Sequence, residues 1–149
     1  IQPESIIHSC VEYMDGSMLS QRGTPDMRTP ISFTLAYPDR IKTDVERLNL
    51  YEIGNLTFHK PNLKKYPCLE LAYDSLEMGK SAPTVLNASN EVAVEAFLCH
   101  EIKFLSIAKV VETTLNNSSI CNINSIKDVI EVDKESREMT MSIIKSGQY

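Results

Sequence analysis

The chain has 149 residues, of which 42% are hydrophobic and 23% are charged, and its formal net charge at pH 7 is −5. This composition is ordinary for a soluble protein with one average domain or parts of two. The negative charge argues against a nucleic-acid-binding surface, and no apolar run approaches the roughly 18 residues of a membrane span. We therefore expect neither nucleic acid nor a membrane among the partners.

The first predicted element is a β-hairpin. Residues 5–14 and 17–22 read as two strands, and Asp15-Gly16 between them favours a two-residue turn, because glycine tolerates a positive φ. Such a ribbon alone is only marginally stable in water. We find no third strand nearby, so the remaining strands are expected from residues outside this chain or from another subunit. The chain is therefore interpreted as a fragment.

Residues 23–30 join the hairpin to the next element. They hold one glycine and two prolines, and the opposite charges of Asp26 and Arg28 flank Met27. A junction of this kind is where functional sites tend to lie. Thr29 is predicted to cap a short helix with Pro30 at its first position, and Pro38 is predicted to end it.

Residues 38–61 show no period, but their apolar side chains indicate an ordered connection that wraps over a neighbouring surface. From Tyr66 the period becomes helical. Pro67 is expected at the first position of a helix that ends at Gly79, with its apolar stripe on the core side. That stripe comprises Leu69, Ala72, Tyr73 and Leu76.

Three further helices are predicted. The second of the bundle lies within residues 87–99, where Asn87 is expected as the cap and Glu91 as a charge placed against the helix dipole. The third carries a stripe formed by Ile107, Val110, Val111 and Thr114, with Ser106 as a possible cap. The last begins near Ser125, where Ser125 and Asp128 resemble a capping box, and it forms either one continuous helix or two helices with a break at Asp133, itself a good cap.

The predicted fold class is α+β: a β-hairpin from the sheet of a larger domain, an ordered connecting segment, and a small C-terminal α-helical bundle. The corresponding ranges are 1–37, 38–65 and 66–149. We find no nucleophile elbow, phosphate loop or dinucleotide fingerprint. The four cysteines and three histidines are scattered, which indicates free thiols in a reducing compartment and no zinc site.

Five motifs, in order, resemble one known family. They are the P-E-S-I-I-H-S strand at 3–9, G-T-P-D-M-R-T-P at 23–30, N-L-T-F at 55–58, Y-P-C-L at 66–69 and L-N-A-S-N-E at 86–91. Together they resemble the 1-deoxy-D-xylulose 5-phosphate reductoisomerases, and the resemblance extends over nearly the whole chain. Gln2 departs from the family pattern, which usually has histidine before Pro3, so no role is transferred to Gln2.

The resemblance implies an NADPH-dependent enzyme that requires Mg, Mn or Co. It would convert the sugar phosphate 1-deoxy-D-xylulose 5-phosphate to 2-C-methyl-D-erythritol 4-phosphate in non-mevalonate isoprenoid biosynthesis. The metal acts as a Lewis acid, and NADPH reduces an aldehyde intermediate. The resemblance also implies a homodimer formed through the catalytic domain, and a location in a bacterial cytoplasm or a plastid-type organelle.

The resemblance further implies that the metal ligands, the nucleotide loop and the phosphate-binding residues precede Ile1. No catalytic or metal-binding residue is therefore expected in this chain, which alone should be inactive. Four residues are expected at the edge of the substrate and cofactor pocket: Pro25, Met27, His8 and Ser5. Met27 would form an apolar wall of the pocket. His8 would help to position the site or form a hydrogen bond there, rather than bind a metal.

An alternative from the residues alone is a stand-alone helical interaction module that dimerises through the β-hairpin. The DNA upstream of Ile1 separates the two hypotheses. A glycine-rich nucleotide loop followed by a D-S-E motif would support the enzyme, and a start codon directly upstream would support the module.

Overall fold

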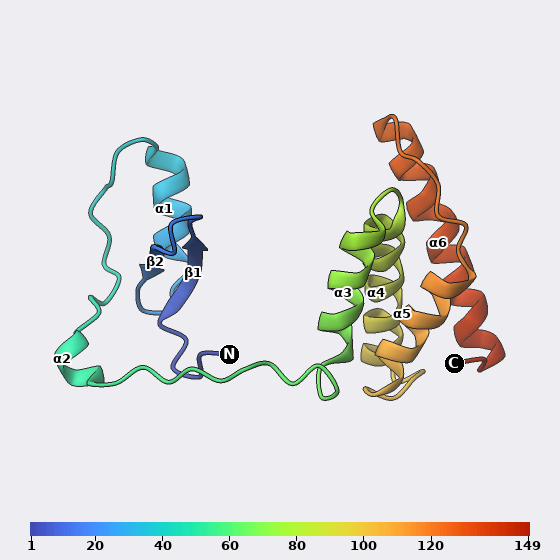
Figure 1. The fold of residues 1–149 in the computed structure, drawn as a ribbon, viewed down its shortest axis with the longest axis horizontal. Helices are drawn as coiled ribbons and strands as arrows, with labels where there is room; N and C mark the ends of the chain where they lie inside the picture. Colours follow the sequence, from blue (N-terminus) through green and yellow to red (C-terminus); the bar gives the residue numbers. More distant parts are fainter. The chain divides into compact units, whose positions relative to one another are not determined.

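Two strands and two short helices precede four longer helices along the chain (Figure 1). The structure is a computed structural model that describes all residues 1–149, and it divides into the units Ile1–Pro61 and Asn62–Tyr149. This order confirms the α+β prediction. The elements are β1 (Ile7–Glu12), β2 (Met18–Arg22), α1 (Arg28–Ala36), α2 (Leu50–Ile53), α3 (Pro67–Met78), α4 (Ala82–Leu98), α5 (Ser106–Asn117) and α6 (Ile126–Ser146).

The predicted hairpin is present, but its turn is longer than expected. β1 and β2 pair antiparallel, and the Tyr13 amide donates to the Ser17 carbonyl over 2.9 Å, which leaves three residues between them. Gly16 has φ +83°, the left-handed conformation that a three-residue loop requires. The prediction of a two-residue turn was therefore wrong, because the Asp15-Gly16 signal also fits this longer loop.

Helix α1 begins earlier than its predicted cap. Met27 occupies the N-cap position without a side-chain cap bond, and Arg28 is the first helical residue. Thr29 and Pro30 therefore lie inside the first turn, and the prediction that Thr29 caps the helix was wrong. The Asp26 side chain accepts from the Arg28 amide over 2.9 Å and supplies a turn bond just before the helix.

The connecting residues return to the start of the chain. Thr24 donates its hydroxyl to the Glu46 carbonyl over 2.9 Å, and the Thr57 amide donates to the Glu4 carboxylate over 3.0 Å. Short helix α2 lies between these two contacts and ends at Gly54. The connection is therefore fastened on both sides of α2 to the segments that flank the hairpin.

Helix α3 has the predicted bounds but turns a different face inward. Pro67 lies at its first position and Gly79, at φ +62°, ends it. Leu69, Tyr73 and Leu76 are exposed, whereas Ser75 is buried. The prediction that this apolar stripe faces the bundle was wrong, since a small serine rather than a leucine fits closest to the neighbouring helices.

Helix α4 starts five residues before the expected cap. Ala82 is its first residue and Pro83 lies in its first turn. Ser81 fixes this start, because its amide donates to the Cys121 carbonyl over 3.0 Å and its hydroxyl accepts from the Cys121 amide over 2.9 Å. The prediction that Asn87 caps the helix was wrong; its amide instead bonds Glu91 one turn later over 3.2 Å.

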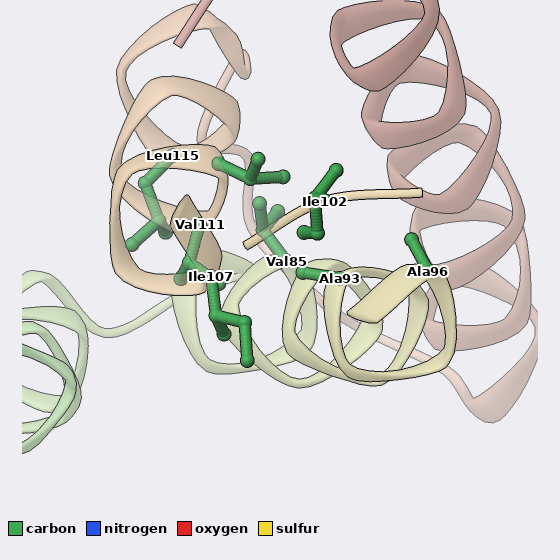
Figure 2. Close-up of a cluster of buried hydrophobic side chains, with 8 residues drawn as sticks. Val85, Ala93, Ala96, Ile102, Ile107, Val111 and Leu115 are labelled. Carbon is green, nitrogen blue, oxygen red and sulfur yellow. The ribbon is translucent and has the colours of Figure 1, made fainter. Parts of the chain in front are cut away.

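The hydrophobic core lies in the second unit, where α4, α5 and α6 pack against one another. Figure 2 shows Ile107, Val111 and Leu115 of α5 close to Val85 and Ala93 of α4. The predicted stripe of α5 is buried at all four positions. Burial of such side chains gives roughly 1.5–3 kcal/mol each, so this cluster is the main source of stability in the bundle.

Helix α6 begins at the predicted capping box. Ser125 accepts from the Asp128 amide, and the Asp128 carboxylate accepts from the Ser125 amide. The helix then continues without a break to Ser146, so the continuous helix is the alternative that forms. Asp133 accepts from Arg137 one turn later over 2.7 Å, which supports the helical conformation there. None of the helices combines the length and the apolar character that a membrane crossing requires.

Candidate functional site: a hollow beside the hairpin

A hollow of about 570 Å³ lies in the first unit. The start of the chain, strands β1 and β2, the loop before α1 and α1 itself all contribute to its lining. The four residues expected at a pocket edge are brought together here. The lining comprises Ser5, His8, Gln21, Thr24, Pro25, Asp26, Met27, Thr29, Pro30, Phe33 and Arg40.

A β-bulge places His8 at this hollow. Ile7 pairs with Arg22 and Ser9 pairs with Gln21, so His8 is an extra residue in β1. A bulge re-aims a side chain and is common next to functional sites. The His8 Nε2 lies 3.2 Å from the Gly23 carbonyl oxygen. Because a carbonyl only accepts, Nε2 carries the hydrogen, and the imidazole links β1 to the loop that follows β2.

Ser5 is held in an unusual backbone conformation at the edge of the hollow. Its φ is +53°, in the left-handed region that residues other than glycine rarely adopt. The Gln2 side-chain oxygen accepts from the Ile6 amide over 2.8 Å, directly after Ser5. Gln2 also donates to Glu4. The residue that departs from the family pattern therefore supports the turn that carries Ser5.

Pro25 and Met27 belong to the apolar part of the wall, together with Pro30 and Phe33. Met27 is 70% exposed, so its thioether is available to a ligand rather than packed in a core. Arg28 bonds Asp26 through two nitrogens, the shorter contact being 2.6 Å. The hydrogen bonds from Arg28 hold the pKa of Asp26 below its usual range, which keeps this carboxylate ionised and paired.

Sequence reasoning missed three lining residues that carry recognition chemistry: Gln21, Phe33 and Arg40. The Arg40 guanidinium carbon lies 4.3 Å from the centre of the Phe33 ring. Arg40 follows Pro38 in a stretch without periodicity, so no sequence pattern pointed to it. Phe33 was assigned only to the body of a helix.

The arrangement suits binding better than chemistry. An apolar wall, a histidine donor and an arginine can orient a ligand that has an apolar part and a charged part. No group of three His, Cys, Asp or Glu side chains is placed to hold a metal ion. The residues present therefore do not fit a metal centre.

The chain is similar to several curated reductoisomerases. It is 48% identical over 148 residues to the 1-deoxy-D-xylulose 5-phosphate reductoisomerase of Trichlorobacter lovleyi, covering 99% of this chain and 38% of that protein. It is 52% identical over 147 residues to the enzyme of that name from Ralstonia pickettii, covering 99% of this chain and 37% of that protein. The chain thus spans somewhat over a third of the length of these relatives.

The chain is also similar to solved structures of reductoisomerases. The reductoisomerase from Zymomonas mobilis in complex with NADPH superposes with a TM-score of 0.87 at 45% identity, over 96% of this chain and 38% of that one. A DOX-P reductoisomerase in complex with NADPH, fosmidomycin and magnesium gives a TM-score of 0.89 at 42% identity, over 97% and 38%. The family model described as DXP reductoisomerase C-terminal domain matches residues 22–139. The chain therefore belongs to the DXP reductoisomerase family, and its residues 22–139 match the C-terminal domain of that family.

Proposed function

We propose that this chain is the C-terminal part of an NADPH- and metal-dependent enzyme that converts 1-deoxy-D-xylulose 5-phosphate to 2-C-methyl-D-erythritol 4-phosphate. The observation that carries the proposal is the hollow that brings Ser5, His8, Pro25 and Met27 together. It lies in a chain that superposes on a relative solved with NADPH, fosmidomycin and magnesium.

In this proposal the chain forms one wall of the active site. Met27 and Pro25 provide an apolar surface for the substrate and the nicotinamide ring and exclude water from between them. His8 and Ser5 fix the position of that surface through the bulge and the Gln2-supported turn. When bound, NADPH supplies the hydride and the divalent metal (Mg, Mn or Co) polarises the substrate oxygens. Both ligands are held mainly by residues outside this chain.

We further propose that residues 1–37 belong to the catalytic domain, 38–65 to a connecting segment and 66–149 to the helical domain. A homodimer through the catalytic domain is supported by the two-stranded sheet, on which Val11 and its cross-strand partner Leu19 are both exposed. The similar curated proteins named above come from bacteria, which supports a bacterial cytoplasm over a plastid-type organelle as the location.

A chimeric enzyme tests the proposed function. The matching part of the Trichlorobacter lovleyi reductoisomerase is replaced by this chain, and NADPH oxidation is followed with the sugar phosphate and magnesium. We expect turnover from the chimera, and none from the chain alone or from the relative truncated before the replaced part. A folded chimera without turnover would overturn the proposal, and turnover by the chain alone would overturn the division of the site.

The proposed dimer is tested on the same chimera by light scattering after size exclusion. A mass of two subunits is expected, and a charged substitution at Leu19 should shift it to one. A monomeric, active chimera would remove the dimer from the proposal without affecting the rest.

A further inference from the structure

The first residues of the chain lie beside the end of the connecting segment (Figure 1). The Ile1 nitrogen donates to the His59 carbonyl over 2.7 Å, and the His59 amide donates to the Ile1 carbonyl over 2.9 Å. Such an exchange of two backbone hydrogen bonds is the pairing unit of an antiparallel ladder. Two residues 58 positions apart are therefore paired close to the turn that carries Ser5.

Glu4 adds a side-chain link between the same two segments. One oxygen of its carboxylate accepts from the Thr57 amide over 3.0 Å, and the other accepts from the Gln2 side-chain amide. The Gln2 side-chain oxygen in turn accepts from the Ile6 amide over 2.8 Å. An ionised carboxylate only accepts and a backbone N–H only donates, so these two neighbours fix which way the Gln2 amide points. A continuous set of hydrogen bonds, the Glu4 relay, therefore connects the Thr57 amide to the Ile6 amide.

The Glu4 carboxylate is ionised in this relay. Its hydrogen bonding with Thr57 is the largest of the effects that hold the pKa of Glu4 below its ordinary value of 4.5. Glu4 takes part in no ion pair of the chain, so neutral N–H donors satisfy its charge. Hydrogen bonds to an ionised acceptor are roughly twice as strong as those between neutral groups. Removal of this carboxylate should therefore weaken the relay more than removal of a neutral acceptor would.

Packing does little to hold this part of the chain in place. Ile6 is the one buried side chain among residues 1–61. Ser5 has a φ of +53°, which a residue other than glycine keeps where its surroundings impose it. The relay holds Ser5 from both sides, because Glu4 precedes it and Ile6 follows it. The position of Ser5 at the hollow therefore depends on polar contacts more than on a core.

We propose that Glu4 is a positioning residue for the pocket wall, because it ties the connecting segment at Thr57 to the turn that carries Ser5. Glu4 lies outside the lining of the hollow, so it acts through Ser5 and His8 rather than on a ligand. This inference rests on the proposed function, in which Ser5 and His8 fix the position of the apolar wall. The connecting segment then supports the binding site as well as linking two domains.

The kinetic test uses the chimeric enzyme with Glu4→Ala, Glu4→Gln and the control Glu46→Ala. Glu46 is exposed, lies outside the hollow and enters the hydrogen bonding of this unit through its carbonyl. Glu4→Ala is expected to raise the KM for the sugar phosphate or for NADPH about 5- to 10-fold, with a smaller change in kcat. Glu4→Gln keeps one acceptor oxygen and should recover part of the loss. A lower kcat with unchanged KM values, which loss of folded enzyme alone would give, or kinetics equal to the control would overturn the inference.

Hydrogen exchange on the 149-residue chain keeps the inference separate from the proposed function. In Glu4→Ala we expect the Thr57 and Ile6 amides both to exchange about fivefold faster, since both lie on the relay, and Glu46→Ala should leave both rates unchanged. Acceleration of the Thr57 amide alone, or equal acceleration of the Val11 amide in β1, would overturn the inference whether or not the chimera turns over. An inactive chimera whose chain still shows the paired acceleration would count against the proposed function alone.

Discussion

The imidazole Nε2 of His8 lies 3.2 Å from the carbonyl oxygen of Gly23, and this contact joins the bulge of β1 to the loop that carries Met27. The two residues are 15 positions apart, and only the hairpin brings them together. The contact fixes the loop from its first residue, and the Asp26–Arg28 pair steadies it further along.

Replacement of His8 should therefore disturb the position of the Met27 loop. In the chimera, His8→Ala is expected to raise the KM for the sugar phosphate or for NADPH about fivefold, since one hydrogen bond contributes roughly 1 kcal/mol. His8→Gln retains a donor and should recover part of the loss. His59→Ala is the control, because that side chain lies outside the hollow. Equal kinetics for His8→Ala and the control would contradict the positioning role.

Met27→Ala should weaken ligand binding without destabilising the fold. The side chain is 70% exposed, so its truncation removes little buried area. We expect a higher apparent constant for the substrate or for NADPH and an unchanged melting temperature. Met14→Ala in the hairpin turn serves as the matched control. An unchanged kinetic profile would remove Met27 from the pocket.

Gln2→Ala should loosen the turn that holds Ser5. The Gln2 oxygen accepts from the amides of Ile6 and Ile7, at 2.8 and 3.4 Å. Loss of this acceptor is expected to speed hydrogen exchange at the Ile6 amide about fivefold. The Val11 amide in the same strand is the internal control and should keep its rate. Equal acceleration at both amides would indicate a general destabilisation of the hairpin instead.

Truncation in the helical core should be far more costly than truncation at its surface. Ile107 is buried in the cluster between α4 and α5, whereas Ile130 on α6 is exposed. Ile107→Ala is expected to lower the free energy of unfolding by about 2–4 kcal/mol, and Ile130→Ala by less than about 0.5 kcal/mol. Urea denaturation of the bundle measures both. Similar losses at the two positions would contradict the packing described for the core.

The contact between Glu91 on α4 and Arg137 on α6 should make the bundle sensitive to acid. Hydrogen bonds from Arg137 and then Asn87 hold the pKa of Glu91 below its ordinary value of 4.5. A lowered pKa in the folded state gives stability that is complete above the ordinary value and is lost as the pH falls through the folded value. The urea midpoint should therefore fall less between pH 7 and about pH 3 in Glu91→Gln than in the natural chain.

Glu131→Gln on the exposed side of α6 is the control for this pH dependence, since Glu131 forms no ion pair. Its urea midpoint should follow the natural chain at both pH values. An identical decrease in Glu91→Gln and the natural chain would show that the contact does not couple proton binding to folding.

Short sequence patterns correctly predicted those features of the fold that are set by residues close together in the chain. The α5 stripe, the Ser125–Asp128 capping box and the Gly79 helix end are all present, because the residues that signal each of them lie close together in the chain. The alternative with a break at Asp133 does not form, since Arg137 on the next turn bonds this carboxylate and also reaches Glu91 on another helix.

The sequence by itself predicted the order of the two strands and of every helix except α2, indicated the family, and proposed four residues for a pocket edge. Tertiary structure decided where α4 begins, through the contact of Ser81 with Cys121, 40 positions away. It also decided that the α3 stripe faces outward and that Arg40 joins the Met27 hollow. Contacts between residues far apart in the chain leave no periodic trace in the sequence, because their spacing is set by the path of the folded backbone.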